Sequence, residues 1–368
     1  MGRLGPFRGT VQPDPPVGEE RLRECAWESS ARLVVPGDWP SGVYVGKLTA
    51  EVDEWQSYVT FVVRDDRPVD FLFHCATNTW QAYNRWPNFF GLYNDGKKHW
   101  YWGPGVRVSY DRPYAQYSET GIVNAPLTTG SGSFLLWEFP LAFWMEKEGY
   151  DVSYVTSVDV HEDPDRILRA RTFLSVGHDE YWSPESYRHV ERAIASGVHA
   201  AFLCGNAVFG IVPFGPSTAG APNRTLTRAG VFTPNEPLLL NRPEQKLFKE
   251  FGPDAGYLMG ARTVAPITGG GDWVCTNEKH WLFEGTGMRN GDVVPGLVGW
   301  EWHGGPAPIP GLEVISTGPT DNGRQKGVYT TVLFPGPRKN LVFNAATIWW
   351  GLGLSEPPGY LRPGKVYV

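Results

Sequence analysis

The chain has 368 residues, of which 41% are hydrophobic and 20% charged, so it has enough apolar side chains to form a packed core. Its net charge of -6 argues against a mainly electrostatic role on nucleic acid or on an anionic membrane. The sequence has no apolar run of about 18 residues and no apolar signal-peptide stretch at its start. We therefore expect a cytoplasmic protein that binds neither nucleic acid nor membrane.

Residues 1–66 are predicted to form an N-terminal arm and a small antiparallel β region. Residues 1–24 are rich in Pro, Gly and Arg, which is typical of an extended arm. Three segments that follow are β-branched or aromatic and bounded by Gly, Pro or Asp, as short strands are. They are residues 31–35, 42–48 and 58–63.

Residues 67–368 are predicted to form one larger domain. Four apolar runs without strict alternation indicate strands that are covered on both faces. They lie at residues 70–75, 152–156, 172–176 and 199–204. Helices are predicted at 139–148, 164–169 and 184–196, the last with Ser183 as N-cap and Gly197 after its end. This alternation predicts an α/β fold with a doubly wound, mostly parallel sheet.

Two stretches depart from this alternation. Residues 84–132 form a long insertion that is rich in Trp and Tyr, and insertions of this length are usually functional. Residues 207–368 are rich in Gly, Pro and Trp and contain short strand-like runs such as 327–333. We interpret them as a β-rich continuation with loops over the carboxyl edge of the sheet.

Polar residues follow three of the predicted strands, at the edge where open parallel sheets bind ligands. They are residues 77–83, residues 177–180 and Asn206. His178 and Glu180 are two apart, so an extended backbone would project both to the same side, as a metal site or an acid-base pair requires. The alternative is that Asp179 or Glu180 favours the N-terminus of the helix near Pro184.

Other patterns are less specific. Asn206 could polarise a substrate carbonyl or could be a left-handed turn residue after Gly205. Tyr181 and Trp182 are predicted to pack. The four cysteines are far apart, which excludes a CxxC zinc site and a disulfide framework. No GxSxG motif and no P-loop occur, so we expect no nucleotide cofactor.

Several segments resemble the large (β) subunit of bacterial N,N-dimethylformamidase and its relatives. The similar segments are residues 79–86 (TWQAYNRW), 109–114 (SYDRPY), 149–156 (GYDVSYVT), 175–183 (SVGHDEYWS), 205–206 (GN), 299–302 (GWEW) and 342–350 (VFNAATIWW). They extend from about residue 40 to residue 354, and the His-Asp-Glu-Tyr-Trp run together with Trp-Gln-Ala-Tyr-Asn is specific.

The resemblance implies a class I glutamine-amidotransferase-like or flavodoxin-like catalytic fold and an amidohydrolase with one iron ion. In the family, two tyrosines and one glutamate hold the iron. The glutamate corresponds to Glu180 and the first tyrosine to Tyr83. Tyr114 is the first choice for the second tyrosine, with Tyr93 next. The family's histidine corresponds to His178, its asparagine to Asn206 and its second carboxylate to Glu301.

This ligand set is chemically coherent, because phenolate and carboxylate oxygens suit Fe(III). A metal-bound water would attack the polarised carbonyl of a small or natural-product-like amide. Glu301 or His178 would serve as general base, and Asn206 would hold the oxyanion.

Two departures from the family bear on substrate and partners. Residues 87–93 (PNFFGLY) replace a Gly-Gly-Lys-Ser-Leu-Tyr-like run, and the N-terminal β region is shorter than in the dimethylformamidase subunit. A homo-oligomer or a small accessory subunit is compatible with the sequence. Two other functions stay open: an iron-dependent redox enzyme acting on an aromatic or peptide-like metabolite, and a non-catalytic binding module.

Overall fold

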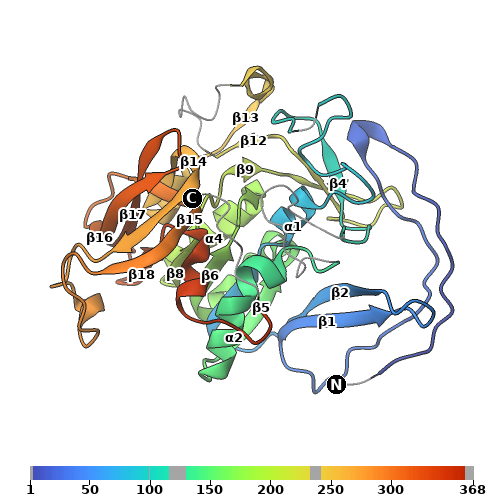
Figure 1. The fold of residues 1–368 in the computed structure, drawn as a ribbon, viewed down its shortest axis with the longest axis horizontal. Coiled ribbons are helices and arrows are strands. Elements are labelled where there is room, and N and C mark those ends of the chain that lie inside the picture. Colours follow the sequence, from blue (N-terminus) through green and yellow to red (C-terminus); the bar gives the residue numbers. More distant parts are fainter. Residues whose placement is uncertain (1–2, 99, 116–129, 233–241, 361–368) are drawn as a thin grey trace.

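A mixed nine-stranded sheet runs through the centre of the molecule (Figure 1). The computed structural model describes residues 3–98, 100–115, 130–232 and 242–360. In spatial order the strands are β15 (Val293–Pro306), β14 (Ala261–Val274), β16 (Glu313–Asp321), β17 (Lys326–Pro335), β18 (Leu341–Asn344), β8 (His199–Cys204), β6 (Ala170–Gly177), β3 (Val69–Cys75) and β5 (Val152–Thr156). Strands β18, β8, β6, β3 and β5 run parallel, and the pairs from β15 to β18 are antiparallel.

Helices cover both faces of the parallel strands. They are α1 (Thr77–Tyr83), α2 (Phe139–Lys147), α3 (Ser157–Glu162), α4 (Pro184–Ser196) and α5 (Ala255–Met259). Apolar side chains of α3 and α4, including Val160 and Val190, pack with Phe173 and Phe202 in one core. Leu141 of α2 packs with the side chains of the opposite face in a second core. The carboxyl ends of these strands therefore lie in a rigid, closely packed frame.

Helix α4 illustrates how local sequence produces these elements. The Ser183 side chain accepts a hydrogen bond from Ser186 N, Pro184 occupies the first position, and Gly197 ends the helix at a φ of 109°. Tyr187, Val190 and Ile194 are buried along one stripe. The predicted cap, length and buried face of this helix are all confirmed.

The predicted fold class is wrong. The chain is β-rich and its large sheet is mixed, which is not the doubly wound, flavodoxin-like α/β fold that we expected. The connections after β16 and β17 are residues 322–325 and 336–340, and each joins two neighbouring strands of the sheet. Such short connections join antiparallel strands, because a parallel crossover takes roughly a dozen residues or more. Residues 261–344 thus continue the same sheet.

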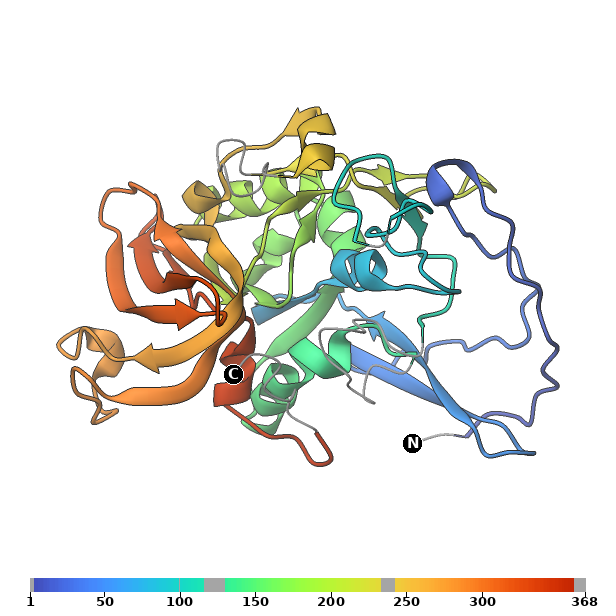
Figure 2. The ribbon, with the colours of Figure 1, turned by 45° about the horizontal axis from the view of Figure 1, so that its top comes forward.

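Shorter elements surround the large sheet (Figure 2). Three small sheets contain β1 (Gly42–Thr49) and β2 (Gln56–Val63); β10 (Phe214–Gly215), β11 (Thr225–Thr227) and β4 (Arg107–Ser109); and β13 (Glu250–Phe251), β12 (Gly230–Val231), β9 (Gly210–Ile211) and β7 (Tyr181–Trp182). Short 3-10 helices are η1 (Glu19–Arg21), η4 (Ile167–Arg169), η5 (Pro243–Leu247), η6 (Trp281–Phe283) and η7 (Ile348–Gly353), and η3 (Phe134–Glu138) is a π-helix.

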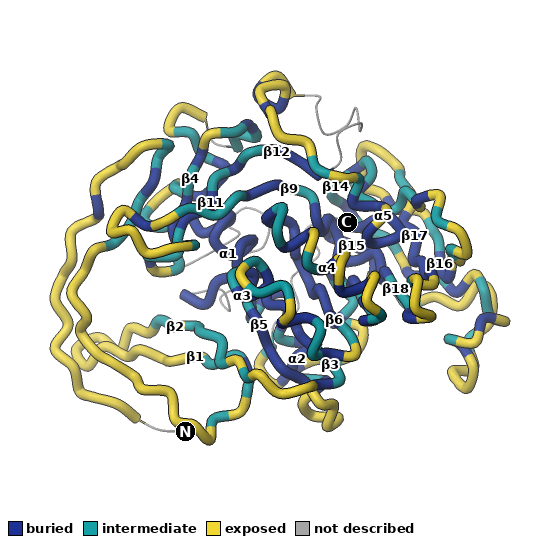
Figure 3. The backbone as a smooth tube through the Cα atoms, turned by 180° about the vertical axis from the view of Figure 1, so that it is seen from behind, coloured by how far each residue is buried: buried dark blue, intermediate teal, exposed yellow. Residues whose placement is uncertain are grey.

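The N-terminal region lies at one side of the molecule, where most of its arm is exposed (Figure 3). Strands β1 and β2 pair only with each other, and residues 31–35 form no strand, so that predicted strand is wrong. Within the described part of the chain, no helix is both long and apolar enough to cross a bilayer.

The antiparallel strands curl until β15 meets the segment that follows β18. Trp302 forms an isolated bridge with Thr347, and His303 N donates to Ala346 O at 3.2 Å. The imidazole of His303 joins this closure to the parallel strands: Nε2 accepts from Ala207 N at 3.0 Å, so Nδ1 carries the proton toward Asn344 Oδ1, also at 3.0 Å. The curl brings the middle of β15 to the carboxyl end of β8.

His303 makes the stability of this closure depend on pH. Burial lowers the pKa of His303 to about 4, while an imidazole in the unfolded chain titrates near 6.5. Between these values the unfolded chain binds one more proton, so the His303 contribution is complete above about pH 6.5 and is lost as pH falls toward 4. Its full size is about 3 kcal/mol.

We predict that lowering the pH from 7 to 4.5 reduces the free energy of unfolding less in His303→Gln than in the wild type. The difference between the two decreases, measured by urea unfolding at both pH values, should be about 2 kcal/mol. The variant is less stable at pH 7, because glutamine cannot reproduce both imidazole hydrogen bonds. An equal pH dependence in the two proteins would show that His303 titrates alike in the folded and unfolded states.

Candidate functional site

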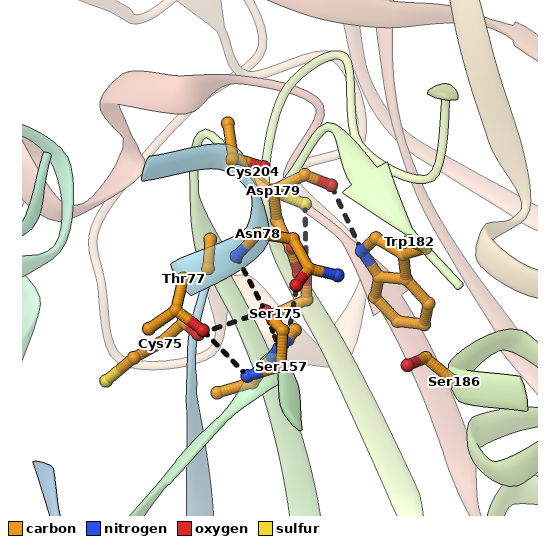
Figure 4. Close-up of polar contacts among 12 residues, drawn as sticks. Cys75, Thr77, Asn78, Ser157, Ser175, Asp179, Trp182, Ser186 and Cys204 are labelled. Atoms are coloured by element: carbon orange, nitrogen blue, oxygen red, sulfur yellow. Dashed lines mark hydrogen bonds and ion pairs between the residues drawn. The ribbon is translucent and has the colours of Figure 1, made fainter. Parts of the chain in front are cut away.

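A buried polar network lies directly beneath the carboxyl ends of the parallel strands (Figure 4). His74, in β3, places Nδ1 at 3.0 Å from Asp179 Oδ2 and Nε2 at 3.1 Å from Ser157 Oγ. Ser175, in β6, donates to the same Asp179 oxygen at 2.7 Å. The network also reaches Asn78 at the start of α1, whose backbone N–H donates to Ser157 Oγ at 3.2 Å. It ties the ends of β3, β5 and β6 to one another.

Residues 178–180 point alternately toward this network and away from it. Gly177 turns the chain with a φ of 68°, and a Cβ there would lie 2.8 Å from Trp137 Cβ, so only glycine fits. Asp179 then faces the network beneath, whereas His178 and Glu180 approach each other, with Nε2 and Oε2 3.3 Å apart. The predicted projection of His178 and Glu180 to the same side agrees with this arrangement. The alternative helix-cap role is filled by Ser183.

Glu180 meets the phenol groups of two tyrosines from different segments. Tyr83, the last residue of α1, donates to Glu180 Oε2 at 2.7 Å. Tyr93, in the insertion, lies 3.0 Å and 3.2 Å from the two carboxylate oxygens of Glu180 and 2.9 Å from Tyr83 Oη. Tyr181, in β7, donates to Tyr93 Oη at 2.7 Å. Four buried side chains thus bring their oxygen atoms to one point.

The electrostatics of this cluster favour protonated phenols when no cation is present. Burial, followed by the negative charge of Glu180, raises the pKa values of Tyr83 and Tyr93 well above their usual range. The guanidinium of Arg228 opposes this for Tyr93, because its carbon lies 4.4 Å from the centre of the Tyr93 ring. A cation placed among the oxygens would favour the ionised phenolates in the same way and more strongly.

A second carboxylate lies on the other side of His178. Glu301, in β15, has Oε2 at 3.0 Å from His178 Nε2. Burial raises the pKa of Glu301 to about 7, although the neighbouring His178 and a hydrogen bond from Asn206 oppose that rise. A carboxyl group with a pKa near neutrality can both accept and return a proton at physiological pH.

Asn206 completes this side of the site. It follows Gly205 at the end of β8 with a φ of 50°, and its Oδ1 accepts from Thr263 Oγ1 at 2.9 Å. A Cβ at Gly205 would clash with the carbonyl group of Glu301, so glycine permits β8 and β15 to approach at this point. The left-handed turn is therefore observed, and the amide of Asn206 hydrogen-bonds to Glu301; its action on a substrate carbonyl stays a prediction.

Tryptophans close the site around His178. The rings of Trp137 and Trp300 stack with centroids 5.8 Å apart, and Trp300 meets the imidazole edge-on at 5.2 Å. His178, Glu180 and Glu301 are each at most 4% exposed. Because water is largely excluded, hydrogen bonds and charges act more strongly here than at the surface.

Two small recesses border Tyr93. One is lined by Tyr83 and by Phe89 and Trp100 of the insertion. The other is lined by Glu180, Arg228 and Phe248. Residues 116–129 of the predicted insertion lie outside the described residues, so only its flanking parts can be placed.

The structure brings five of the six predicted site residues together: Tyr83, His178, Glu180, Asn206 and Glu301. Tyr114, the sixth, does not join them. Its ring packs against Trp80 with centroids 6.3 Å apart, and its phenol hydrogen-bonds to Gln81. The choice of Tyr114 over Tyr93 is not supported by this geometry, because Tyr93 is the insertion tyrosine whose phenol reaches Glu180.

Two contributors to the site were missed or misassigned. Tyr181 was predicted to pack rather than to act in catalysis; it does pack in a core cluster, and its hydroxyl also bonds to that of Tyr93. The sequence did not predict that Arg228 lies in the site, because an isolated arginine in a loop-rich region is not distinguished from a surface arginine. The position of Tyr181 directly after Glu180 was the one available signal, since Tyr181 also follows the carboxyl end of β6.

The oxygen cluster is the place where this chain could hold a metal ion. Among the residues with described positions, no group of three or more His, Cys, Asp and Glu side chains is arranged for a metal. A metal ion at this cluster would use phenol oxygens together with the carboxylate of Glu180. Tyr83, Tyr93 and Glu180 offer hard oxygen donors within 2.7–3.2 Å of one another, which suits a hard, highly charged cation.

Comparison with known families and proteins bears on this site. A search among curated proteins found no match. The family described as "N,N-dimethylformamidase beta subunit-like, C-terminal" matches residues 1–362, which include every residue of the site. The chain therefore belongs to the N,N-dimethylformamidase beta subunit-like family.

Proposed function

We propose that this protein is an iron-dependent hydrolase that cleaves the C–N bond of an amide. One observation carries the proposal: two buried tyrosines and a buried glutamate converge at hydrogen-bond distance, and a second carboxylate lies beside them across His178. Membership of a family named for N,N-dimethylformamidase supports hydrolysis of this class of bond.

Tyr83, Tyr93 and Glu180 would hold the iron. Two phenolates and a carboxylate would carry three negative charges, which match the charge of a ferric ion. The positive charge of the ion would favour the ionised phenolates although both tyrosines are buried. When bound, such an ion supplies Lewis-acid chemistry: it polarises the carbonyl of an amide and lowers the pKa of a water molecule.

The neighbouring residues supply the proton transfers. Glu301 takes a proton from the attacking water, and the 3.0 Å contact with His178 Nε2 orients the Glu301 carboxylate for this step. The oxygen of the water forms a bond to the carbonyl carbon. The amide group of Asn206 donates to the oxygen that gains negative charge.

The second half of the reaction returns that proton. The C–N bond breaks, and Glu301 passes the proton to the departing nitrogen with His178 beside it. The products are a carboxylic acid and an amine, so water and amide are consumed in equal amounts and no oxidant is needed. Burial favours the protonated form of Glu301 and the neighbouring His178 favours the ionised form, so the carboxyl group can take up a proton and return it.

The recess beside Tyr83 bears on the substrate. Phe89 and Trp100 line it, and Phe89 lies in residues 87–93, which depart from the family pattern, so the amide can differ from dimethylformamide. The family description also refers to a beta subunit, which supports the expectation of an oligomer or an accessory subunit. A cytoplasmic location stays a prediction.

The first test is metal content. Protein purified without added metal should contain about one iron per chain, and Glu180→Gln should lose most of it, because a neutral amide replaces the anionic ligand. The matched control is Glu138→Gln, which alters a buried glutamate that accepts from Ala76 N and Trp80 Nε1. Wild-type protein free of any transition metal would refute the proposal.

The second test compares two tyrosines by visible spectroscopy. Tyrosinate bound to ferric iron gives a charge-transfer band that colours the protein. Tyr93→Phe should weaken and shift this band, whereas Tyr114→Phe should leave it unchanged, because Tyr114 packs against Trp80 away from Glu180. The reverse result would restore Tyr114 as the second tyrosine ligand.

The third test concerns the proton carrier. Glu301→Gln should retain iron but hydrolyse amides about 100- to 10,000-fold more slowly, since glutamine cannot accept the proton. Release of amine from a panel of formamides and aryl amides measures this, with oxygen consumption followed in parallel. Turnover that consumes oxygen would indicate an iron redox enzyme instead.

A further inference from the structure

Tyr83 and Tyr93 lie on two different segments whose separation must be set by something other than regular structure. Tyr83 is the last residue of α1, and the chain between the two tyrosines contains no helix or strand. Their phenol oxygens nevertheless lie 2.9 Å apart. A connection of this kind can adopt many conformations, so a ligand pair built on it needs contacts that select one.

The guanidinium of Arg112 makes such contacts on both sides. Its Nη2 donates to Gln81 O at 2.7 Å, two residues before Tyr83. Its Nη1 donates to Trp86 O at 3.1 Å and to Phe90 O at 2.9 Å, three residues before Tyr93. Its Nε donates to Ser109 O at 3.0 Å, which ties the loop to β4.

This interaction depends on the shape of arginine. A guanidinium has five N–H donors in a rigid plane, so several carbonyl groups that bind it are held at fixed relative positions. A lysine has one nitrogen at the end of a flexible chain and cannot hold the same carbonyls together. Arg112 belongs to the Ser-Tyr-Asp-Arg-Pro-Tyr motif, which the proposed hydrolysis leaves without a role.

Burial of the charged Arg112 guanidinium destabilises the folded protein unless other contacts compensate for the lost hydration. Its exposed fraction is 7%, and within the described ranges no carboxylate forms an ion pair with it. A buried charge without a counter-charge destabilises a protein unless its hydrogen bonds are satisfied. A neutral side chain of similar size would fill the same volume at less free energy, so packing alone does not account for an arginine here.

A second close contact draws the loop onto the helix in the same place. Leu92 N donates to Ala82 O at 2.8 Å, and a Cβ at Gly91 would lie 2.9 Å from that oxygen. The residues just before Tyr93 therefore lie directly against the residue before Tyr83. Arg112 acts at both ends of this contact.

We propose that Arg112 is a positioning residue that sets the distance and orientation between the Tyr83 and Tyr93 phenol groups. This inference rests on the proposed function, in which those phenols hold iron. Arg112 touches neither the phenol oxygens nor the carboxylate of Glu180; it acts through the backbone that carries the two tyrosines.

The test uses the purified full-length protein and three variants. Arg112→Met keeps the length of the side chain without donors, and Arg112→Lys keeps the charge without the planar group. Both should bind iron about 10- to 100-fold more weakly in a competition with a chelator, and their tyrosinate-to-iron band should shift. Arg166→Met is the control, because Arg166 is also buried but pairs with Asp66 and Asp163.

Circular dichroism identifies variants that fail to fold. If both Arg112 variants fail, Gly91→Ala tests the same contact, because its added methyl group should push the loop away from Ala82 O and shift the band. Unchanged iron affinity and an unchanged band in a folded Arg112 or Gly91 variant would overturn this inference. Wild-type protein without iron or the band would instead overturn the proposed function.

Discussion

The carboxylate of Glu180 lies almost without solvent, 2% exposed, and its hydrogen-bond donors are phenol groups rather than a lysine or arginine. A buried carboxylate destabilises a protein by several kcal/mol unless its surroundings satisfy it. Here the satisfying groups come from α1, from the insertion and from the turn after β6. Strands and loops from several parts of the chain are therefore needed to hold these three segments around one buried carboxylate.

The rigidity of the site comes from its two supports. Below it, the contact between His74 and Asp179 joins β3 to the residue before Glu180 inside a closely packed sheet. Beside it, the curl of the antiparallel strands carries Glu301 to the end of β8, and His303 fastens that curl. One support is built from parallel strands and the other from antiparallel strands, so the site lies where the two parts of the sheet meet.

The insertion builds the site from the side opposite to β15. It supplies Tyr93, and through Phe89 and Trp100 it lines one of the two recesses that border Tyr93. Around Tyr93, residues 84–98 of the insertion form no helix or strand, and such a segment can vary in sequence while the strands behind it stay the same. This division allows the residues that line the recess to change while Glu180, His178 and Glu301 keep their positions.

Local patterns in the sequence determined the buried strands, helix α4 with its Ser183 cap, and the gathering of Tyr83, His178, Glu180 and Asn206 at one edge. These follow from runs of apolar residues, from capping chemistry and from the rule that parallel strands end together. The type of sheet was not determined in this way, because the pairing of β14 with β16 and of β18 with β8, which joins the antiparallel strands to the parallel ones, involves partners far apart in the chain. The doubly wound fold was predicted by extending the pattern of residues 67–204 to residues whose short connections forbid it.

The same limit applies to the second tyrosine, because no local pattern separates Tyr93 from Tyr114. Only the packing of the insertion against α1 decides that the phenol of Tyr93 meets Glu180. The phenol of Tyr114 meets Gln81 instead.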